Sequence, residues 1–194
     1  MPDLLRLARN RSQAAVSKAR AHLPPELGGR FSSEDVEARL IDRQAANAFR
    51  LGSMRAAEEI RKAAREEEQP EGEFHVGLYL EGRLVAVGSA SKMWKSLGDQ
   101  GPWFGGDRVL PELRGRGLGR VLHGKRLDEL RSRGTEGSVR VHVNEKNKRS
   151  LASLGAAGFA PSRDGDLARR ITDEMISRGA SPGSRYIVVE REIG

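Results

Sequence analysis

The sequence predicts one α/β domain preceded by a helical extension, and three patterns support this fold class. "FHVGLYL" (74–80) and "RLVAVGSAS" (83–91) flank the dipeptide Glu81-Gly82, which predicts a β-hairpin. Residues 114–134 begin with alternating glycine and arginine and continue as an amphipathic helix. "SVRVHV" (138–143) then alternates as a strand does. At 194 residues the chain has room for one ordinary domain with a core.

The N-terminal part of the chain is predicted to be helical. A weakly apolar face predicts a helix over 3–22, which "PPELGG" (24–29) ends. A second helix is predicted to begin after an N-cap at Ser32 or Ser33 and to run to a break at Gly52, with 54–64 continuing in register. Its apolar stripe consists of Val36, Leu40, Ala45, Ala48 and Leu51. We therefore divide the chain into an extension, 1–29, and a domain, 30–194.

Beyond the hairpin, strands and helices alternate. "LGDQGPWFGG" is a loop that leads into a strand ending near Leu110. The later elements are a helix closed by Gly134, a strand at 138–143, a helix at 148–156, an extended piece at 158–159, a helix at 166–178 and a closing strand at 184–193.

Composition excludes several kinds of site. The chain has no cysteine, so disulfides, thiolate zinc sites and cysteine nucleophiles are ruled out. No cluster has metal-ligand spacing, and no run approaches a membrane span. Without a signal peptide the expected location is the cytoplasm, although the arginine-rich first 23 residues also suit a transit peptide or a helix on an anionic surface. The net charge of +7 favours an anionic partner: nucleic acid, an acidic surface or a phosphorylated cofactor.

The glycines at the start of the predicted helix indicate a phosphate site. A helix N-terminus offers free N–H groups and partial positive charge, and glycine lets a phosphate approach the backbone. The dinucleotide fingerprint would need its third glycine at Arg120. A P-loop would need Ser or Thr at Arg126. Neither known motif fits.

A different motif fits the spacing. "RGRGLG" (114–119) matches R-x-x-G-x-G, Asn147 follows Arg114 by 33 residues, and Gly158-Phe159 lies 11 residues beyond. These segments resemble motif A and the N-x-x-[SA]…G-F segment of the GNAT superfamily of acyl-CoA N-acyltransferases. The resemblance covers about residues 74–192. It implies a mixed, mostly antiparallel central sheet with helices on both faces, and a slot where the strands ending at Val109 and Val143 separate. Residues 1–65 do not show the usual first strand.

The resemblance also implies the ligands and the residues that hold them. The donor would be acetyl-CoA and the acceptor an amine of a small molecule, a peptide or a protein, with nucleic acid less favoured and a homodimer compatible with it. The implied cofactor-binding residues are Asp107, Arg108, Val109, Arg114, Gly115, Arg116, Gly117, Leu118, Gly119, Arg120 and Asn147.

Candidate catalytic residues are fewer. His142 is placed to act as the general base, and Asp107 is the alternative. Leu154 stands where the family often has a proton-donating tyrosine, so the acid would be water, Tyr186 or Ser153. The aromatic residues Trp94, Trp103 and Phe104 could line an acceptor pocket, whereas His75 and His123 are interpreted as surface or packing residues. Two alternatives to an enzyme stay open: a non-catalytic CoA-binding module, and a basic nucleic-acid-binding protein.

Overall fold

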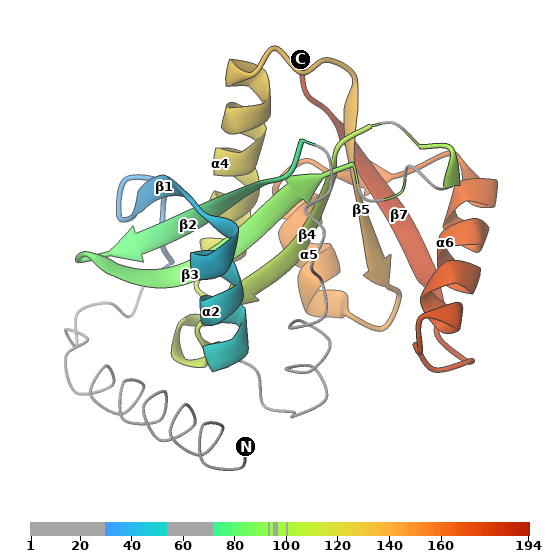
Figure 1. The fold of residues 1–194 in the computed structure, drawn as a ribbon, viewed down its shortest axis with the longest axis horizontal. Helices are drawn as coiled ribbons and strands as arrows, with labels where there is room; N and C mark the ends of the chain where they lie inside the picture. The colour runs from blue at the N-terminus through green and yellow to red at the C-terminus, as the bar shows by residue number, and fades with distance from the viewer. Residues whose placement is uncertain (1–29, 54–71, 93, 95–96, 100) are drawn as a thin grey trace.

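The computed structural model describes residues 30–53, 72–92, 94, 97–99 and 101–194, and these residues form one seven-stranded sheet with helices on both faces (Figure 1). The strand order is β1-β2-β3-β4-β5-β7-β6, and every neighbouring pair is antiparallel except β4 and β5, which are parallel. The mixed, mostly antiparallel sheet is therefore confirmed. Its strands are β1 (Glu37–Ile41), β2 (Phe74–Leu80), β3 (Arg83–Ser91), β4 (Trp103–Val109), β5 (Ser138–Asn144), β6 (Ala160–Pro161) and β7 (Tyr186–Glu192).

Two adjacent residues of β3 show which helices cover which face. A Cβ on Gly88 would lie 2.9 Å from Leu122 Cδ2, so this side of the sheet faces α4. The hydroxyl of Ser89 points the other way and accepts a hydrogen bond from Arg50 of α2. The four α-helices of the described residues are α2 (Arg43–Ser53), α4 (Leu118–Ser132), α5 (Lys148–Ala156) and α6 (Gly165–Ser177).

The core is divided by the sheet in the same way. Phe104 belongs to the large cluster beneath α4 and α5, and the preceding Trp103 belongs to a smaller cluster beneath α6. Both side chains are fully buried. Successive strand residues thus face opposite layers, as the pleat of a strand requires.

The predicted helix over 34–51 is wrong in its first half. Residues 37–41 form the edge strand β1, which pairs antiparallel with β2. Val36 and Leu40 have helical spacing, but an edge strand that is mostly exposed does not need an alternating pattern, and Leu40 is 55% exposed. The helix begins later, where the side chain of Asp42 accepts from Ala45 N at 2.6 Å. Ser32 instead makes a turn with the carboxylate of Asp35.

The later elements agree with the sequence. The hairpin strands are confirmed, and its turn residues Glu81 and Gly82 have φ of 50° and 75°, which suits a two-residue hairpin turn. The short extended piece is β6, slightly later than predicted. The helix predicted at 148–156 coincides with α5, and the other helices and strands differ from prediction by at most two residues at their ends. The predicted helix at 3–22, the segment 54–64 and the extension 1–29 lie outside the described residues. No described helix is long and apolar enough to cross a membrane.

Candidate functional site

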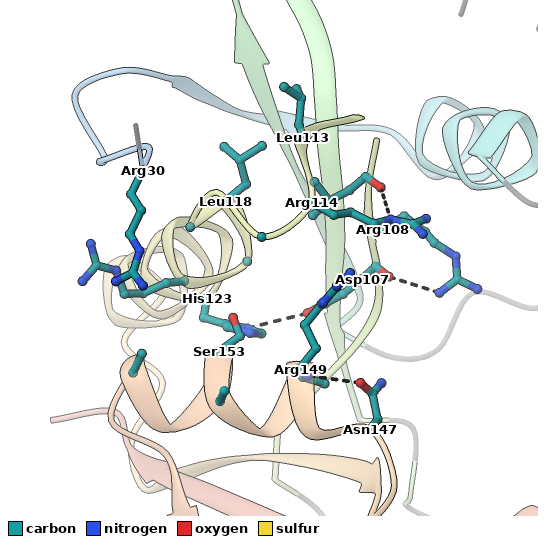
Figure 2. A pocket seen from close by; sticks show the side chains of 18 residues that line it. Arg30, Asp107, Arg108, Leu113, Arg114, Leu118, His123, Asn147, Arg149 and Ser153 are labelled. Atoms are coloured by element: carbon teal, nitrogen blue, oxygen red, sulfur yellow. Dashed lines mark hydrogen bonds and ion pairs between the residues drawn. The ribbon is translucent and has the colours of Figure 1, made fainter. Parts of the chain in front are cut away.

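The site begins where β4 and β5 separate. Their parallel register consists of one residue pair, Trp103 with Arg140, whereas β5 pairs with β7 over its whole length. Beyond that pair a cavity of about 710 Å3 lies between β4, the start of α4, and α5 (Figure 2). Because β4 leaves its neighbour there, its backbone edge is open to a ligand.

The N-terminus of α4 forms one end of this cavity. Its N-cap, Gly117, is left-handed with φ of 90° and provides no side-chain cap. The first α-helical bond runs from Val121 N to the Gly117 carbonyl oxygen, so the amides of Leu118 and Gly119 come before it and are directed out of the helix end. These amides and the helix dipole favour an anion at this place.

Gly117 also accommodates the segment that precedes β1. A Cβ there would lie 3.0 Å from the carbonyl oxygen of Phe31, whose amide donates to the Arg116 carbonyl at 2.7 Å. Gly115, with φ of 82°, has open space around its missing Cβ. The glycine at 117 thus serves both the turn and a close backbone contact, whereas the one at 115 serves the turn alone.

The cavity is lined by positive charge. Among the described residues that line it, Asp107 carries the one carboxylate. The basic residues that line it, from four parts of the chain, are Arg30, Arg108, Arg114, Arg120 and Arg149. Such a surface suits a ligand with several negative charges.

Asp107 forms an ion pair with a buried arginine, Arg126. Arg126 on α4 is fully buried, and its Nη1 and Nη2 lie 2.8 and 2.9 Å from the carboxylate oxygens of Asp107. Arg126 also donates to the Ser89 carbonyl at 2.7 Å and lies over the Phe104 ring, 4.1 Å from its centroid. Burial lowers the pKa of Arg126, and Asp107 opposes this shift. The pair fixes the carboxylate at the cavity floor.

His123 lies in the same cluster and lines the cavity. Its Nδ1 is 2.7 Å from Arg126 Nη2 and 3.7 Å from Asp107 Oδ2, the contact drawn in Figure 2. Burial lowers the pKa of His123 to about 4, so the ring is neutral at pH 7. Sequence reasoning placed His123 among surface or packing residues. The missed signal is its position four residues after Gly119, which puts both residues on one face of the helix.

Asn147 begins α5 at the opposite wall. Its side-chain oxygen accepts from Ser150 N at 3.1 Å, which caps the helix, and the residue also lines the cavity. Ser153 lines the cavity six residues later, and its Oγ lies 2.7 Å from where a Cβ of Gly119 would be. Leu154 points into the core instead, 1% exposed.

Most of the residues around this cavity lie in a part of the sequence that matches a protein-family model. The acetyltransferase (GNAT) family model matches residues 40–159, well over half of the sequence. The chain belongs to this family. The match includes the glycine-rich turn at 114–119, β4, β5 and α5, and ends at Phe159.

Solved GNAT-type structures share the fold at low sequence identity. The ribosomal-protein-S18-alanine N-acetyltransferase of Escherichia coli is 16% identical, with a TM-score of 0.55 over 82% of this chain and 94% of its own. The yncA protein of Salmonella typhimurium, solved with its cofactor acetyl-CoA, is 17% identical, with a TM-score of 0.57 over 82% and 95%. Spermidine/spermine N-acetyltransferase SpeG of Vibrio cholerae is 12% identical, with a TM-score of 0.55 over 83% and 94%. No curated protein sequence matches the chain significantly.

Most residues that the GNAT resemblance assigns to the cofactor meet in this cavity. Arg116 is the exception: it does not line the cavity, and its guanidinium lies over the Phe31 ring, 4.8 Å from the centroid. Arg30 and Arg149 line the cavity although the motif does not include them. The residues brought together are Asp107, Arg108, Val109, Arg114, Gly115, Gly117, Leu118, Gly119, Arg120 and Asn147.

His142 and Tyr186 lie outside this lining, on the α6 face of the sheet. The His142 ring is 5.1 Å from Trp94 and 5.9 Å from Tyr186 between ring centroids. Trp94 Nε1 lies 3.3 Å from His142 Nδ1, and because an indole can only donate, Nδ1 is the acceptor. Burial lowers the pKa of His142 to about 4, and Arg178 adds to the shift. This arrangement engages the lone pair that a general base would need, and it does not support the role predicted for His142.

The three aromatic residues suggested as an acceptor wall belong to the core. Trp94 and Trp103 are 2% and 0% exposed and pack edge to face, 6.2 Å between centroids, under α6. Phe104 is buried on the other face of the sheet, under α4. The prediction failed because an aromatic residue beside a glycine-rich loop has the same local sequence whether it lines a pocket or anchors a strand.

Proposed function

We propose that this protein transfers an acetyl group from acetyl-CoA to an amine. The observation that carries the proposal is the cavity between β4, α4 and α5, whose one end has an uncapped helix N-terminus with a left-handed glycine and whose rim carries five arginines. Family membership supports the same reaction class.

The residues present fit a CoA thioester. The amides of Leu118 and Gly119 and the arginines of the rim would hold the phosphates. The free backbone edge of β4 at 107–109 would hold the pantetheine arm by strand-like hydrogen bonds. The bound thioester would supply an acyl carbon that is open to attack by a neutral amine.

The transfer needs few groups from the protein. The amine nitrogen forms a bond to the acyl carbon, the carbon–sulfur bond breaks, and the amine proton leaves to water or to a carboxylate. Asp107 is the carboxylate at the cavity floor and is our candidate acceptor for that proton, with water as its relay. His142 stays a prediction for this step and Tyr186 for the acid, and both require a ligand to reach the α6 face.

The first test is binding. Wild-type protein titrated with acetyl-CoA in a calorimeter should bind it, and the double variant R120A/R149A should bind about tenfold or more weakly, because two charge-assisted contacts are lost. The control is R169A on α6, which should bind as the wild type does. The Arg169 side chain is 72% exposed, is paired with Asp166 and does not line the cavity. Equal affinity in the wild type and R120A/R149A would place the ligand elsewhere.

The second test is transfer. Labelled acetyl-CoA incubated with a panel of polyamines, amino-acid amines and peptide N-termini should label at least one amine in the presence of the wild-type protein. Binding without transfer to any amine would instead support the non-catalytic CoA-binding alternative. Binding of RNA or DNA in preference to acetyl-CoA would support the nucleic-acid alternative.

A further inference from the structure

His123 marks the inner end of the cavity. Its ring is stacked parallel to that of Phe104, with 6.3 Å between centroids and 6° between planes. Phe104 directly follows Trp103, the β4 residue of the single pair that joins β4 to β5. His123 therefore lies where the strands begin to separate, whereas the phosphate-binding turn at 114–119 lies at the outer end. A ligand with its phosphates at that turn would bring the far end of its arm toward His123.

The tautomer of His123 is fixed by its surroundings. Arg126 Nη2 lies 2.7 Å from Nδ1, and a guanidinium can only donate, so Nδ1 is the acceptor. The neutral ring then carries its proton on Nε2. Among the residues that the structure describes, the polar contacts of the His123 ring, to Arg126 and Asp107, both involve Nδ1 and none involves Nε2, and His123 lines the cavity. The cavity thus contains a neutral N–H donor whose direction is fixed by a buried cation.

We propose that His123 donates this Nε2–H hydrogen bond to the sulfur of the bound thioester and stabilises the thiolate as it leaves. The inference rests on the function proposed above. The amine nitrogen bonds to the acyl carbon, the electron pair of the carbon–sulfur bond moves to sulfur, and the amine proton goes to water or Asp107 and finally to the thiolate. His123 keeps its proton throughout, because a neutral imidazole is a hydrogen-bond donor but a very weak acid.

Arg126 acts in this scheme as a positioning residue. Arg126 sets the tautomer, and Asp107 balances its charge within the same buried cluster. The hydrogen bond would serve the purpose of the tyrosine that similar enzymes carry where this chain has Leu154, a buried core residue. A developing thiolate is stabilised by a donor that is already oriented when the reaction begins.

Ser153 is the rival donor. Its hydroxyl faces Gly119, one helical turn from His123, so both side chains reach the same region of the cavity (Figure 2). A hydroxyl rotates freely and is not held by any charged neighbour recorded in the described residues, whereas the His123 donor is held in one direction. The two candidates make different predictions for single variants.

The pKa of the CoA thiol, measured in the bound state by thiolate absorbance, tests the proposal without turnover. Hydrogen bonding to the charged form lowers a pKa, so bound CoA should titrate at least about one pH unit lower in the wild type than in H123L. H123Q, which retains an N–H donor near the position of Nε2, should recover part of the shift. S153A should behave as the wild type, and thermal melting of each variant shows that it is folded.

The results separate the inference from the function on which it rests. Failure of the wild type to bind CoA would overturn both. Normal binding with the same thiol pKa in the wild type, H123L and H123Q would overturn the role of His123 alone and leave it a packing residue. A loss of CoA affinity in H123L without a change in thiol pKa would mean that His123 donates to an amide carbonyl of the pantetheine arm instead of to the sulfur. This result would also overturn the inference. A raised thiol pKa in S153A but not in H123L would assign the role to Ser153.

The tautomer can be read in the free protein. Nitrogen chemical shifts of the labelled His123 ring should show a protonated Nε2 and an unprotonated Nδ1 at pH 7. A protonated Nδ1 would overturn the proposal before any ligand is added. Steady-state kinetics then measure the contribution of the hydrogen bond to catalysis. The kcat of H123L should fall about 10- to 100-fold, somewhat less than when an oxyanion-hole donor is removed, and its KM for acetyl-CoA should stay within about threefold of the wild type.

Discussion

His123 and His142 lie on opposite faces of the sheet and differ in what surrounds them. Both are neutral, with pKa values lowered to about 4 chiefly by burial, and both accept a hydrogen bond at Nδ1. His123 receives it from a fully buried arginine and lines the cavity. His142 receives it from Trp94 among aromatic rings and lies outside the cavity lining. A histidine's function therefore depends on which edge of its ring is left for a ligand.

Removing the charged partner of His123 should have the largest effect on stability. R126M deletes a buried cation, leaves Asp107 without its partner and removes the contact over the Phe104 ring. We expect the free energy of unfolding to fall by about 3 kcal/mol. Urea denaturation measures it. The matched control is R120M on the same helix, where the arginine is exposed and the expected change is below about 0.5 kcal/mol. A loss below about 1 kcal/mol in R126M would show that the buried pair contributes little.

Acid should destabilise the protein through the same buried histidine. The pKa of His123 is about 4 in the folded state and near 6.5 when unfolded, so the unfolded chain binds more protons between these values. The contribution of His123 to the free energy of unfolding is fully present above about pH 6.5 and is lost as the pH falls toward 4. This contribution is up to about 3 kcal/mol.

The variant H123Q isolates this contribution. Its unfolding free energy should decline less steeply than that of the wild type between pH 7 and pH 4, because one buried group no longer titrates. His75, which burial also gives a pKa of about 4, remains in both proteins and cancels in the difference. Parallel curves for the two proteins would mean that His123 titrates normally in the fold.

Much of this arrangement could be predicted from the sequence, and the rest depends on tertiary contacts. The hairpin, the glycine-rich turn at the start of α4 and the order of later elements follow from local periodicity and from the spacing between "RGRGLG", Asn147 and Gly158. Strand β1 was missed because it is an exposed edge whose pairing with β2 is set by distant residues. The tautomer of His123 could not be predicted either, because the sequence around it does not show that Arg126 is buried against its Nδ1.

His142 was selected for the opposite reason. Its position on the strand that leaves the slot is correct, since it lies on β5. The sequence could not show that Trp94, 48 residues earlier, donates to its Nδ1. Charge and residue type indicate which side chains can do chemistry, but the hydrogen-bond partners come from parts of the chain that meet only in the fold.

Removing the hydrogen bond to Nδ1 of His142 should have a smaller effect, which we expect in the pKa of this residue. W94F retains an aromatic ring but removes the N–H that bonds Nδ1, and this bond favours the neutral form. The pKa of His142 should therefore rise, by about one unit or less, in an NMR titration. The pKa of His123, on the other face of the sheet, should not change. An equal shift of both histidines would instead report a general loosening of the fold.

Replacing His142 itself should have the smallest effect on transfer. H142F retains a ring beside Trp94 and Tyr186 and removes both nitrogens. A general base contributes about 10²- to 10⁴-fold, so if His142 accepts the amine proton, kcat/KM should fall by that much below about pH 7.5, where the amine is still charged. Because Trp94 holds the lone pair that this task needs, we expect a loss below about tenfold that is the same at every pH. A steep loss confined to low pH would restore His142 as the base, and it would mean that the Trp94 hydrogen bond breaks when substrate binds.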